Sequence, residues 1–246
     1  MTNIWMNEGV NILALLGTLV NGICIIIGAL LGAFFRNIPE RVKSTVMNGI
    51  GLSVVVLGVK MGLESDQFLI VIISLVVGGV LGEMWDIEEK LERLGKWVER
   101  RMGYGAEGMI SKGFVSATLL FVVGSMAIVG ALHSGLRGDH LVLYTKSILD
   151  GFASIILTAT FGIGVLFSAI PVVIYQGSIA LMATQIDRFI PASALEAFIA
   201  ESTATGGILI IAIGLNMLRL TSVRVANLLP SILVNAFIVA FMYTLF

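Results

Sequence analysis

Apolar residues run along the chain in long stretches that short polar segments separate. Runs of roughly 18 or more apolar residues are long enough to cross the hydrocarbon core of a bilayer as helices. Only Phe161-Gly162 separates the fifth run from the sixth. The pattern predicts an all-α polytopic membrane protein with about eight transmembrane helices, at residues 10–35, 42–63, 67–84, 113–136, 141–160, 163–186, 194–218 and 222–246.

Composition supports this class. The 246 residues are 57% hydrophobic and only 13% charged, and the mean hydropathy is +1.01. A soluble domain of this length does not carry so much apolar surface, so we expect one transmembrane domain over residues 1–246 with the lipid bilayer as its main partner. The net charge of −1 gives no basis for nucleic-acid binding.

The distribution of basic residues predicts the topology. If the N-terminus lies outside, the inner loops hold eleven Lys and Arg and the outer loops hold four, as the positive-inside rule requires. We therefore predict that both termini lie outside. The inner set is Arg36, Arg41, Lys43, Lys90, Arg93, Lys96, Arg100, Arg101, Lys112, Arg219 and Arg224, and the outer set is Lys60, Arg137, Lys146 and Arg188.

Residues 86–102 predict an amphipathic helix on the cytoplasmic side. Apolar residues recur there at helical spacing, and the remaining positions include five acidic and five basic residues. This balance argues against a polybasic lipid-binding patch. Three roles stay open for this helix: lying on the inner membrane face, pairing with its copy in a homodimer, or serving as a solvated connector.

Two parts of the chain resemble each other. The sequence RNIP at 36–39 follows the first span and RFIP at 188–191 follows the sixth. We infer a three-helix repeat, with residues 10–84 as the first copy, 163–246 as the second and 113–160 as a central helix pair. Because five spans, an odd number, separate the starting points of the two copies, the repeat is inverted, as in many secondary transporters. Gly51, Gly58 and Met61 correspond to Gly207, Gly214 and Met217, and Asn21-Gly22 corresponds to Gln176-Gly177.

The seventh predicted span carries the most conspicuous polar group. Glu201 is followed by three hydroxyl residues and by Gly206-Gly207. A carboxylate at membrane depth is costly and usually faces a protein interior or a water-filled cavity. Alternatively, Glu201 lies near the start of its helix at headgroup level, where the helix dipole favours it. The candidate ligands here are Glu201, Ser202, Thr203 and Thr205.

Polar residues followed by glycine recur at predicted membrane depth. Such pairs let a helix unwind and present polar groups to a ligand, or they simply allow close helix packing. Lys146 lies four residues before Asp150 and shares its helix face, either as a structural pair or as a pair that an ion or substrate can open. Ser125 lines a cavity or bonds back to its own helix. The further candidate ligands are Asn21, Asn48, Ser125, Asp150 and Gln176.

Enzyme signatures are missing from the sequence. HExxH, GxSxG, Walker A and CxxC motifs do not occur, and the two histidines, His133 and His140, are too few to suggest a metal site. We therefore expect no enzymatic activity, no metal and no cofactor.

Six stretches resemble the YdfK/YqgA-type family of uncharacterised bacterial inner-membrane proteins. They are residues 121–130, Lys146 to Gly151, 162–169, Tyr175 to Gly177, Thr205 to Gly207 and Ala226 to Pro230. The likeness covers nearly the whole chain and implies a bacterial inner-membrane location. It supplies no agreed substrate and no assigned site.

Together these features favour a secondary transporter of a small polar solute or ion. Proton or sodium coupling through Glu201, with Asp150 as a second candidate, is the mechanism we expect. The alternatives are a non-transporting scaffold or regulatory protein that works through residues 86–102, and an ion channel.

Overall fold

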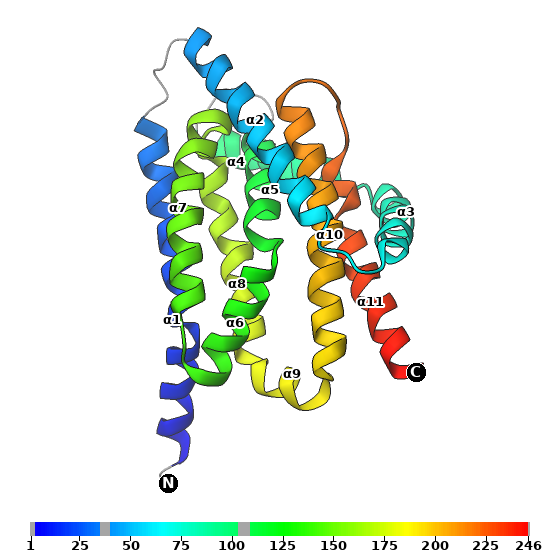
Figure 1. Ribbon diagram of the computed structural model, residues 1–246. Coiled ribbons are helices and arrows are strands. Elements are labelled where there is room, and N and C mark those ends of the chain that lie inside the picture. Colours follow the sequence, from blue (N-terminus) through cyan, green and yellow to red (C-terminus); the bar gives the residue numbers. More distant parts are fainter. Residues whose placement is uncertain (1–2, 35–39, 103–108, 246) are drawn as a thin grey trace.

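The structure is a computed structural model that describes residues 3–34, 40–102 and 109–245. All regular secondary structure in these ranges is helical (Figure 1). The α-helices are α1 (Asn3–Phe34), α2 (Glu40–Gly62), α3 (Phe68–Trp85), α4 (Ile87–Met102), α5 (Met109–Val122), α6 (Ser125–Arg137), α7 (Leu141–Phe161), α8 (Ala169–Leu181), α9 (Ala183–Phe189), α10 (Ala192–Met217) and α11 (Pro230–Leu245), with 3-10 helices η2 (Ile163–Ser168) and η3 (Val225–Leu228).

The all-α membrane architecture is confirmed, but the count of eight spans is too high. Within the described residues, six helices are long and apolar enough to cross a membrane, or seven if the bent pair α5 and α6 forms one span. The predicted span at 42–63 fails because the apolar part of α2 covers only Asn48–Gly62. The predicted span at 113–136 is broken, since α5 and α6 meet at an angle of 61°.

Glycine permits two of the breaks. Gly124, between α5 and α6, has a φ of 130°, and Gly162, between α7 and η2, has a φ of 78°. Side-chain-bearing residues rarely adopt either conformation. The separation of the fifth and sixth predicted spans at Phe161-Gly162 is therefore confirmed.

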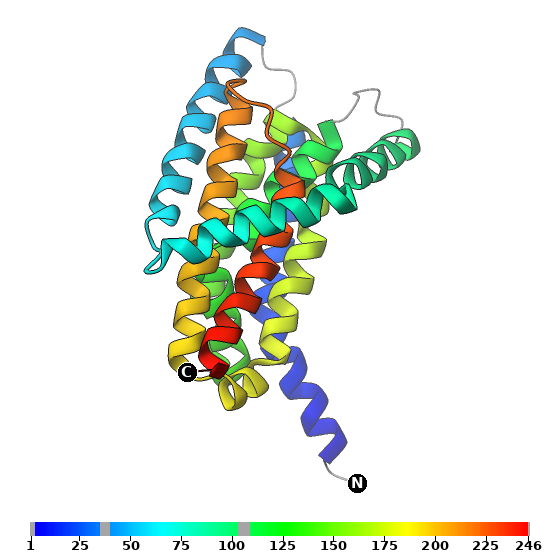
Figure 2. The same cartoon turned by 90° about the vertical axis from the view of Figure 1, so that its right-hand side faces the viewer.

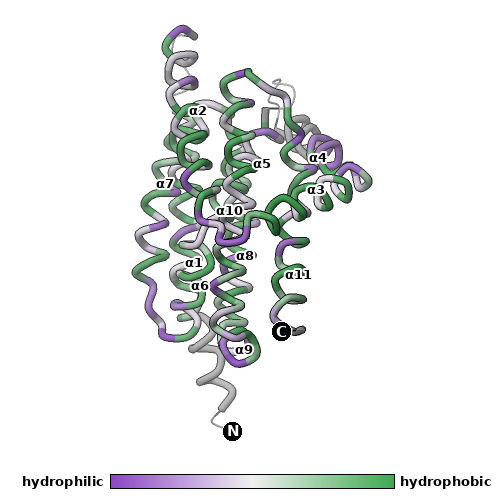
Figure 3. The backbone as a smooth tube through the Cα atoms, turned by 45° about the vertical axis from the view of Figure 1, so that its right-hand side comes forward, coloured by the Kyte–Doolittle hydropathy of each residue, from purple (hydrophilic) through white to green (hydrophobic). Residues whose placement is uncertain are grey.

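Helices α2 and α3 form a hairpin whose turn lies about half-way along the bundle. α2 runs beside α10 from the upper end in Figure 1 and stops about half-way, and α3 then crosses the bundle at a steep angle to α10 and α11 (Figure 2). The turn at 63–67 forms a hydrophilic segment at mid-height (Figure 3). α3 is apolar enough to span a membrane, yet its direction differs from that of the upright spans.

Glycines bring neighbouring helices into backbone contact. A Cβ atom at Gly28 of α1 would collide with the carbonyl oxygen of Gly151 in α7, and one at Gly78 of α3 would collide with the backbone of Ser231 in α11. A Cβ atom at Gly58 of α2 would lie 2.6 Å from the Gly207 carbonyl oxygen of α10. Helices in membranes associate by this kind of close packing.

The two ends of the bundle differ in what they carry. The first described turn of α1 and the last turn of α11 lie at the same end of the bundle, with α9 and the α6–α7 connection (Figure 1). The opposite end carries the start of α2, helix α4 and the loop at 218–224 (Figures 1 and 2). The first described turn of α1 and the last described turn of α11 therefore lie at one end of the bundle.

Reciprocal side-chain caps join α4 to the start of η3. Asn227 Oδ1 accepts the backbone N–H of Glu88 at 2.7 Å, and the Glu88 carboxylate accepts the backbone N–H of Ala226 at 2.9 Å. The Asn227 amide also donates to Glu83 at 2.7 Å. These contacts fix the sharp turn between α3 and α4, where Asp86 takes a left-handed conformation with φ of 51°.

A pair of alanine substitutions in α2 tests its contact with α10. Gly58→Ala should lower the free energy of unfolding by about 1–3 kcal/mol, because the added methyl group meets backbone atoms that cannot move aside. Gly49→Ala is the matched control, since a Cβ atom there has no neighbour within 4 Å, and it should be neutral or slightly stabilising. Thermal unfolding of the purified proteins in detergent measures both, and equal effects would contradict the close contact.

Candidate functional site

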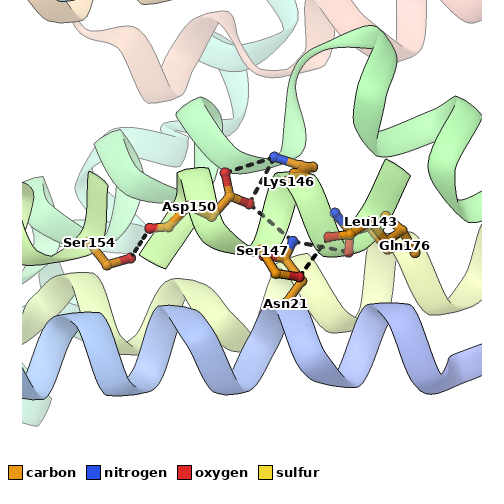
Figure 4. A network of polar contacts seen from close by, with 7 residues as sticks. All are labelled: Asn21, Leu143, Lys146, Ser147, Asp150, Ser154 and Gln176. Atoms are coloured by element: carbon orange, nitrogen blue, oxygen red, sulfur yellow. Dashed lines mark hydrogen bonds and ion pairs between the residues drawn. The ribbon is translucent and has the colours of Figure 1, made fainter. Parts of the chain in front are cut away.

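A buried polar cluster joins α1, α7 and α8 in the middle of the bundle (Figure 4). We call Asn21, Lys146, Asp150 and Gln176 the ion-pair cluster. Lys146 Nζ lies 2.9 Å from Asp150 Oδ1 and 2.8 Å from Oδ2. Asn21 Nδ2 donates to Asp150 Oδ2 at 3.0 Å and to Gln176 Oε1 at 3.2 Å. All four side chains are buried, Asn21 and Gln176 completely.

Local structure explains why these groups meet. Lys146 and Asp150 are one turn apart on α7, so their side chains share a face. Asp150 is the tenth residue of the 21 in α7, which places its carboxylate near the middle of the span. The close contact at Gly28 and Gly151 lets α1 approach α7 so that Asn21 reaches Asp150.

The ion-pair cluster leaves hydrogen-bonding capacity unused. Asn21 Oδ1, Gln176 Nε2 and the hydroxyl of Thr18 are buried without a partner. Turning the Asn21 amide over would bring its oxygen against the Asp150 carboxylate, which can only accept, so the orientation shown is the favourable one. Each buried and unpaired polar group costs about 1–3 kcal/mol. The cluster therefore keeps an unused donor and an unused acceptor beside the ion pair.

A second buried carboxylate holds the α2–α3 hairpin. Glu201 accepts the hydroxyl of Ser65 at 2.6 Å and the backbone N–H groups of Asp66 and Gln67 at 3.0 and 2.8 Å. We call these contacts the hairpin clamp. Glu201 is only 2% exposed and lies about 14 Å along α10 from its first residue, Ala192. The alternative that Glu201 lies near the start of its own helix is therefore wrong. Its carboxylate instead binds the N-terminal end of another helix, α3.

Hydroxyl groups beside Glu201 contact α11. Ser202 Oγ donates to Asn235 Oδ1 at 3.2 Å, and Asn235 Nδ2 donates to Thr205 Oγ1 at 3.0 Å. Thr203 is buried, and its hydroxyl has no partner. This part of α10 also packs on the broken helix, because a Cβ atom at Gly206 would overlap Val123, the residue before Gly124.

The candidate ligand-binding residues lie in two groups, and two of them lie apart from both groups. Asn21, Asp150 and Gln176 meet in the ion-pair cluster, and Glu201, Ser202, Thr203 and Thr205 surround or adjoin the hairpin clamp. Asn48 is exposed on α2, away from both groups. Ser125 is half-buried at the first position of α6.

The hydroxyl of Ser125 makes no hydrogen bond among the residues that the structure describes. Within the same ranges, no three His, Cys, Asp or Glu side chains converge on a position for a metal ion.

Sequence reasoning missed Ser65 and Asn235. Ser65 lies in a short polar turn, and its role depends on a helix 136 positions later in the chain. Asn235 offered a signal, because it interrupts the apolar run of the last span. A buried amide in such a run needs a partner from a neighbouring helix.

Comparison with known proteins identifies the family of the chain. A family described as "Protein of unknown function (DUF554)" matches residues 16–240. The chain belongs to the DUF554 family. It is 32% identical to "Uncharacterized membrane protein YdfK" of Bacillus subtilis (strain 168) over 223 residues, which cover 89% of this chain and 93% of that protein.

A second relative is "Uncharacterized protein YqgA" of Escherichia coli (strain K12). It is 26% identical over 226 residues, which cover 89% of this chain and 93% of the relative. No solved structure matches the chain. The resemblance inferred from the sequence motifs is thereby confirmed, and the DUF554 family adds no assigned site.

Removal of the Glu201 carboxylate tests the hairpin clamp. Glu201→Ala should cost about 1–3 kcal/mol of stability, because two backbone N–H groups of the turn lose their acceptor. Glu196→Ala, at an exposed position of the same helix, should change stability by no more than about 0.5 kcal/mol. Limited proteolysis between residues 63 and 67 should become faster only in Glu201→Ala. Similar stability and cleavage in the two variants would show that the clamp does not hold the hairpin.

Proposed function

We propose that this protein is a secondary transporter of a small polar solute or ion in the bacterial inner membrane, driven by a proton or sodium gradient. The observation that carries the proposal is the ion-pair cluster. Charged side chains in the middle of a membrane span are expensive and usually mark ion or substrate pathways. Here a buried pair from α7 is joined to amides from α1 and α8 that keep an unused donor and acceptor.

In the proposed mechanism, Asp150 is the coupling carboxylate. While Lys146 contacts both of its oxygens, the pair is neutral and the cluster is closed. A proton or a sodium ion that reaches Asp150 competes with the Lys146 ammonium group. The released ammonium group then has no buried partner, which is unfavourable enough to drive a change in the packing of α7 against α1 and α8.

Glu201, which the sequence made the first candidate for coupling, takes a different part in this mechanism. Its two oxygens are occupied by three donors of the 65–67 turn. A cation or proton at Glu201 would compete with these donors and free the tip of the hairpin. We propose that the hairpin clamp is a gate that the coupling cation releases, next to the broken helix α5–α6.

An inverted repeat fits the contacts between the proposed copies. Gly51 of α2 lies against Gly214 of α10, and Gly58 lies against Gly207. If Gly51 corresponds to Gly207 and Gly58 to Gly214, this is the reciprocal pattern that a two-fold axis generates. The proposed equivalents Asn21 and Gln176 also contact each other. We therefore propose a pseudo-two-fold axis in the membrane plane that passes between the two copies.

A double substitution separates structural from functional roles of the ion pair. Lys146→Met and Asp150→Asn alone should each destabilise the protein by about 3–5 kcal/mol, because each leaves one buried polar partner uncompensated. Lys146→Met combined with Asp150→Asn should recover most of that stability, since the remaining amide still accepts from Asn21. We expect the double variant to fold and to respond less strongly to the coupling cation than the wild type, because only Glu201 is then left to bind it.

The response is measured as the shift in unfolding temperature between sodium chloride and choline chloride, at pH 6 and pH 8, because a ligand of the folded state stabilises it. Glu196→Gln is the control and should respond as the wild type does. Equal responses of the wild type and the double variant would refute coupling at Asp150. A wild type without any response would favour the scaffold.

Cysteine labelling tests the proposed orientation. In a Cys24→Ser background, Asp139→Cys lies at the end that carries the termini, and Leu220→Cys lies at the opposite end on a side chain that is 69% exposed. Because basic residues concentrate near the second end, we expect a membrane-impermeant maleimide to label residue 139 in intact spheroplasts and residue 220 only after lysis. The reverse pattern would invert the orientation.

A further inference from the structure

A cavity of about 450 Å³ lies at the end of the bundle that carries the 218–224 loop. It is lined by the first turns of α5, the last turns of α10 and that loop, with single residues of α4, α7 and η3. Its apolar wall is formed by Val115, Phe161, Ile213 and Met217, and its polar wall carries the hydroxyls of Ser111, Ser116, Thr221 and Ser222. The cavity thus combines an apolar surface with hydroxyl donors.

The charge around the cavity is positive. Lys112, Arg219 and Arg224 line it against one acidic residue, Glu88. Arg224 already pairs with Glu83 at 2.9 Å, and the Glu88 carboxylate accepts the N–H of Ala226. Lys112 and Arg219 have no ion-pair partner in the part of the chain that the structure describes. Among the described residues, two cationic groups at this cavity are therefore without an ion-pair partner.

The loop that presents Arg219 is held in place before any ligand arrives. Asn216 at the end of α10 accepts the Thr221 hydroxyl at 2.8 Å and the Val223 N–H at 2.9 Å, and it donates to the Val223 carbonyl at 2.7 Å. Arg219 itself has a φ of 58°. A loop whose backbone is already ordered loses less conformational entropy when a ligand binds to it.

The opposite wall supplies further donors. Ser111 is 7% exposed and stands in the first turn of α5, where backbone N–H groups have no acceptor within the helix. Lys112 is the next residue. A hydroxyl, the first turn of a helix, an ammonium group and the guanidinium of Arg219 thus belong to the lining of one cavity, and carboxylates and phosphates are bound by donors of these kinds.

We propose that this cavity binds the carboxylate or phosphate group of a small organic anion, with Lys112 and Arg219 as its charge partners and the α10 wall as the surface for its carbon skeleton. That this anion is the transported substrate rests on the proposed transport function. Binding of the anion to the cavity does not depend on that function. The same anionic group can come from a soluble metabolite or from a phospholipid headgroup.

Binding is tested on the full-length protein in nanodiscs of neutral phosphatidylcholine. Potassium phosphate and potassium benzoate are titrated against potassium chloride of equal ionic strength, and the unfolding temperature is followed. The wild type should show a saturable rise with at least one of the two probes. Lys112→Gln combined with Arg219→Gln should weaken binding, because hydrogen bonds to charged groups are lost. The half-saturating probe concentration should rise about tenfold or more.

Two control variants test whether binding depends on the positive charges at residues 112 and 219. Arg137→Gln, at an exposed position of the opposite end, should bind as the wild type does, and Lys112→Arg should retain binding because the charge is kept. A second set of nanodiscs with phosphatidylglycerol distinguishes the sources. Stabilisation by this lipid that depends on Lys112 and Arg219, without an effect of soluble probes, assigns the site to a headgroup.

The proposal is overturned if neither soluble probe nor phosphatidylglycerol stabilises the protein in a way that depends on Lys112 and Arg219. This result is distinct from a failure of the transport proposal. A protein that binds the anion but shows no cation response from Asp150 would keep the anion site and lose the coupling mechanism.

Discussion

The contact between Glu201 and the 65–67 turn lets a chain reverse its direction inside the bundle. Hydrocarbon offers no hydrogen-bond partners, so backbone amides of a turn at membrane depth must be satisfied by the protein itself. Glu201 takes two such amides and a hydroxyl. Because α10 carries this carboxylate and also packs along α2 through glycines, one helix fixes both the position and the end of the hairpin.

The same requirement shapes the rest of the bundle. Polar groups in the interior are joined across helices: Asn21 to Asp150 and Gln176, and Asn235 to Ser202 and Thr205. Glycines make these short contacts possible by allowing backbones to approach. Some buried polar groups still lack a partner, and two of them, on Asn21 and Gln176, belong to the ion-pair cluster.

Sequence periodicity predicted what depends on neighbours along the chain. Lys146 and Asp150 could be paired because four residues separate them, and Asn21 could be related to Gln176 through the repeat. The burial of Glu201 followed from its apolar surroundings. Hydropathy, however, reports how apolar a segment is and not where it points. The turn between α2 and α3 is bound by Glu201, which lies far away in sequence, and two segments that were predicted as spans form a hairpin.

The hairpin clamp also sets an order in which the protein can be assembled. Ser65 and Glu201 are 136 positions apart. At ordinary rates of synthesis the ribosome needs on the order of ten seconds to make the chain between them. Until α10 has entered the membrane, the amides of the turn have no carboxylate to accept them, and the hairpin must stay near water or be shielded by the insertion machinery. The last third of the chain thus decides when the first third can reach its final depth.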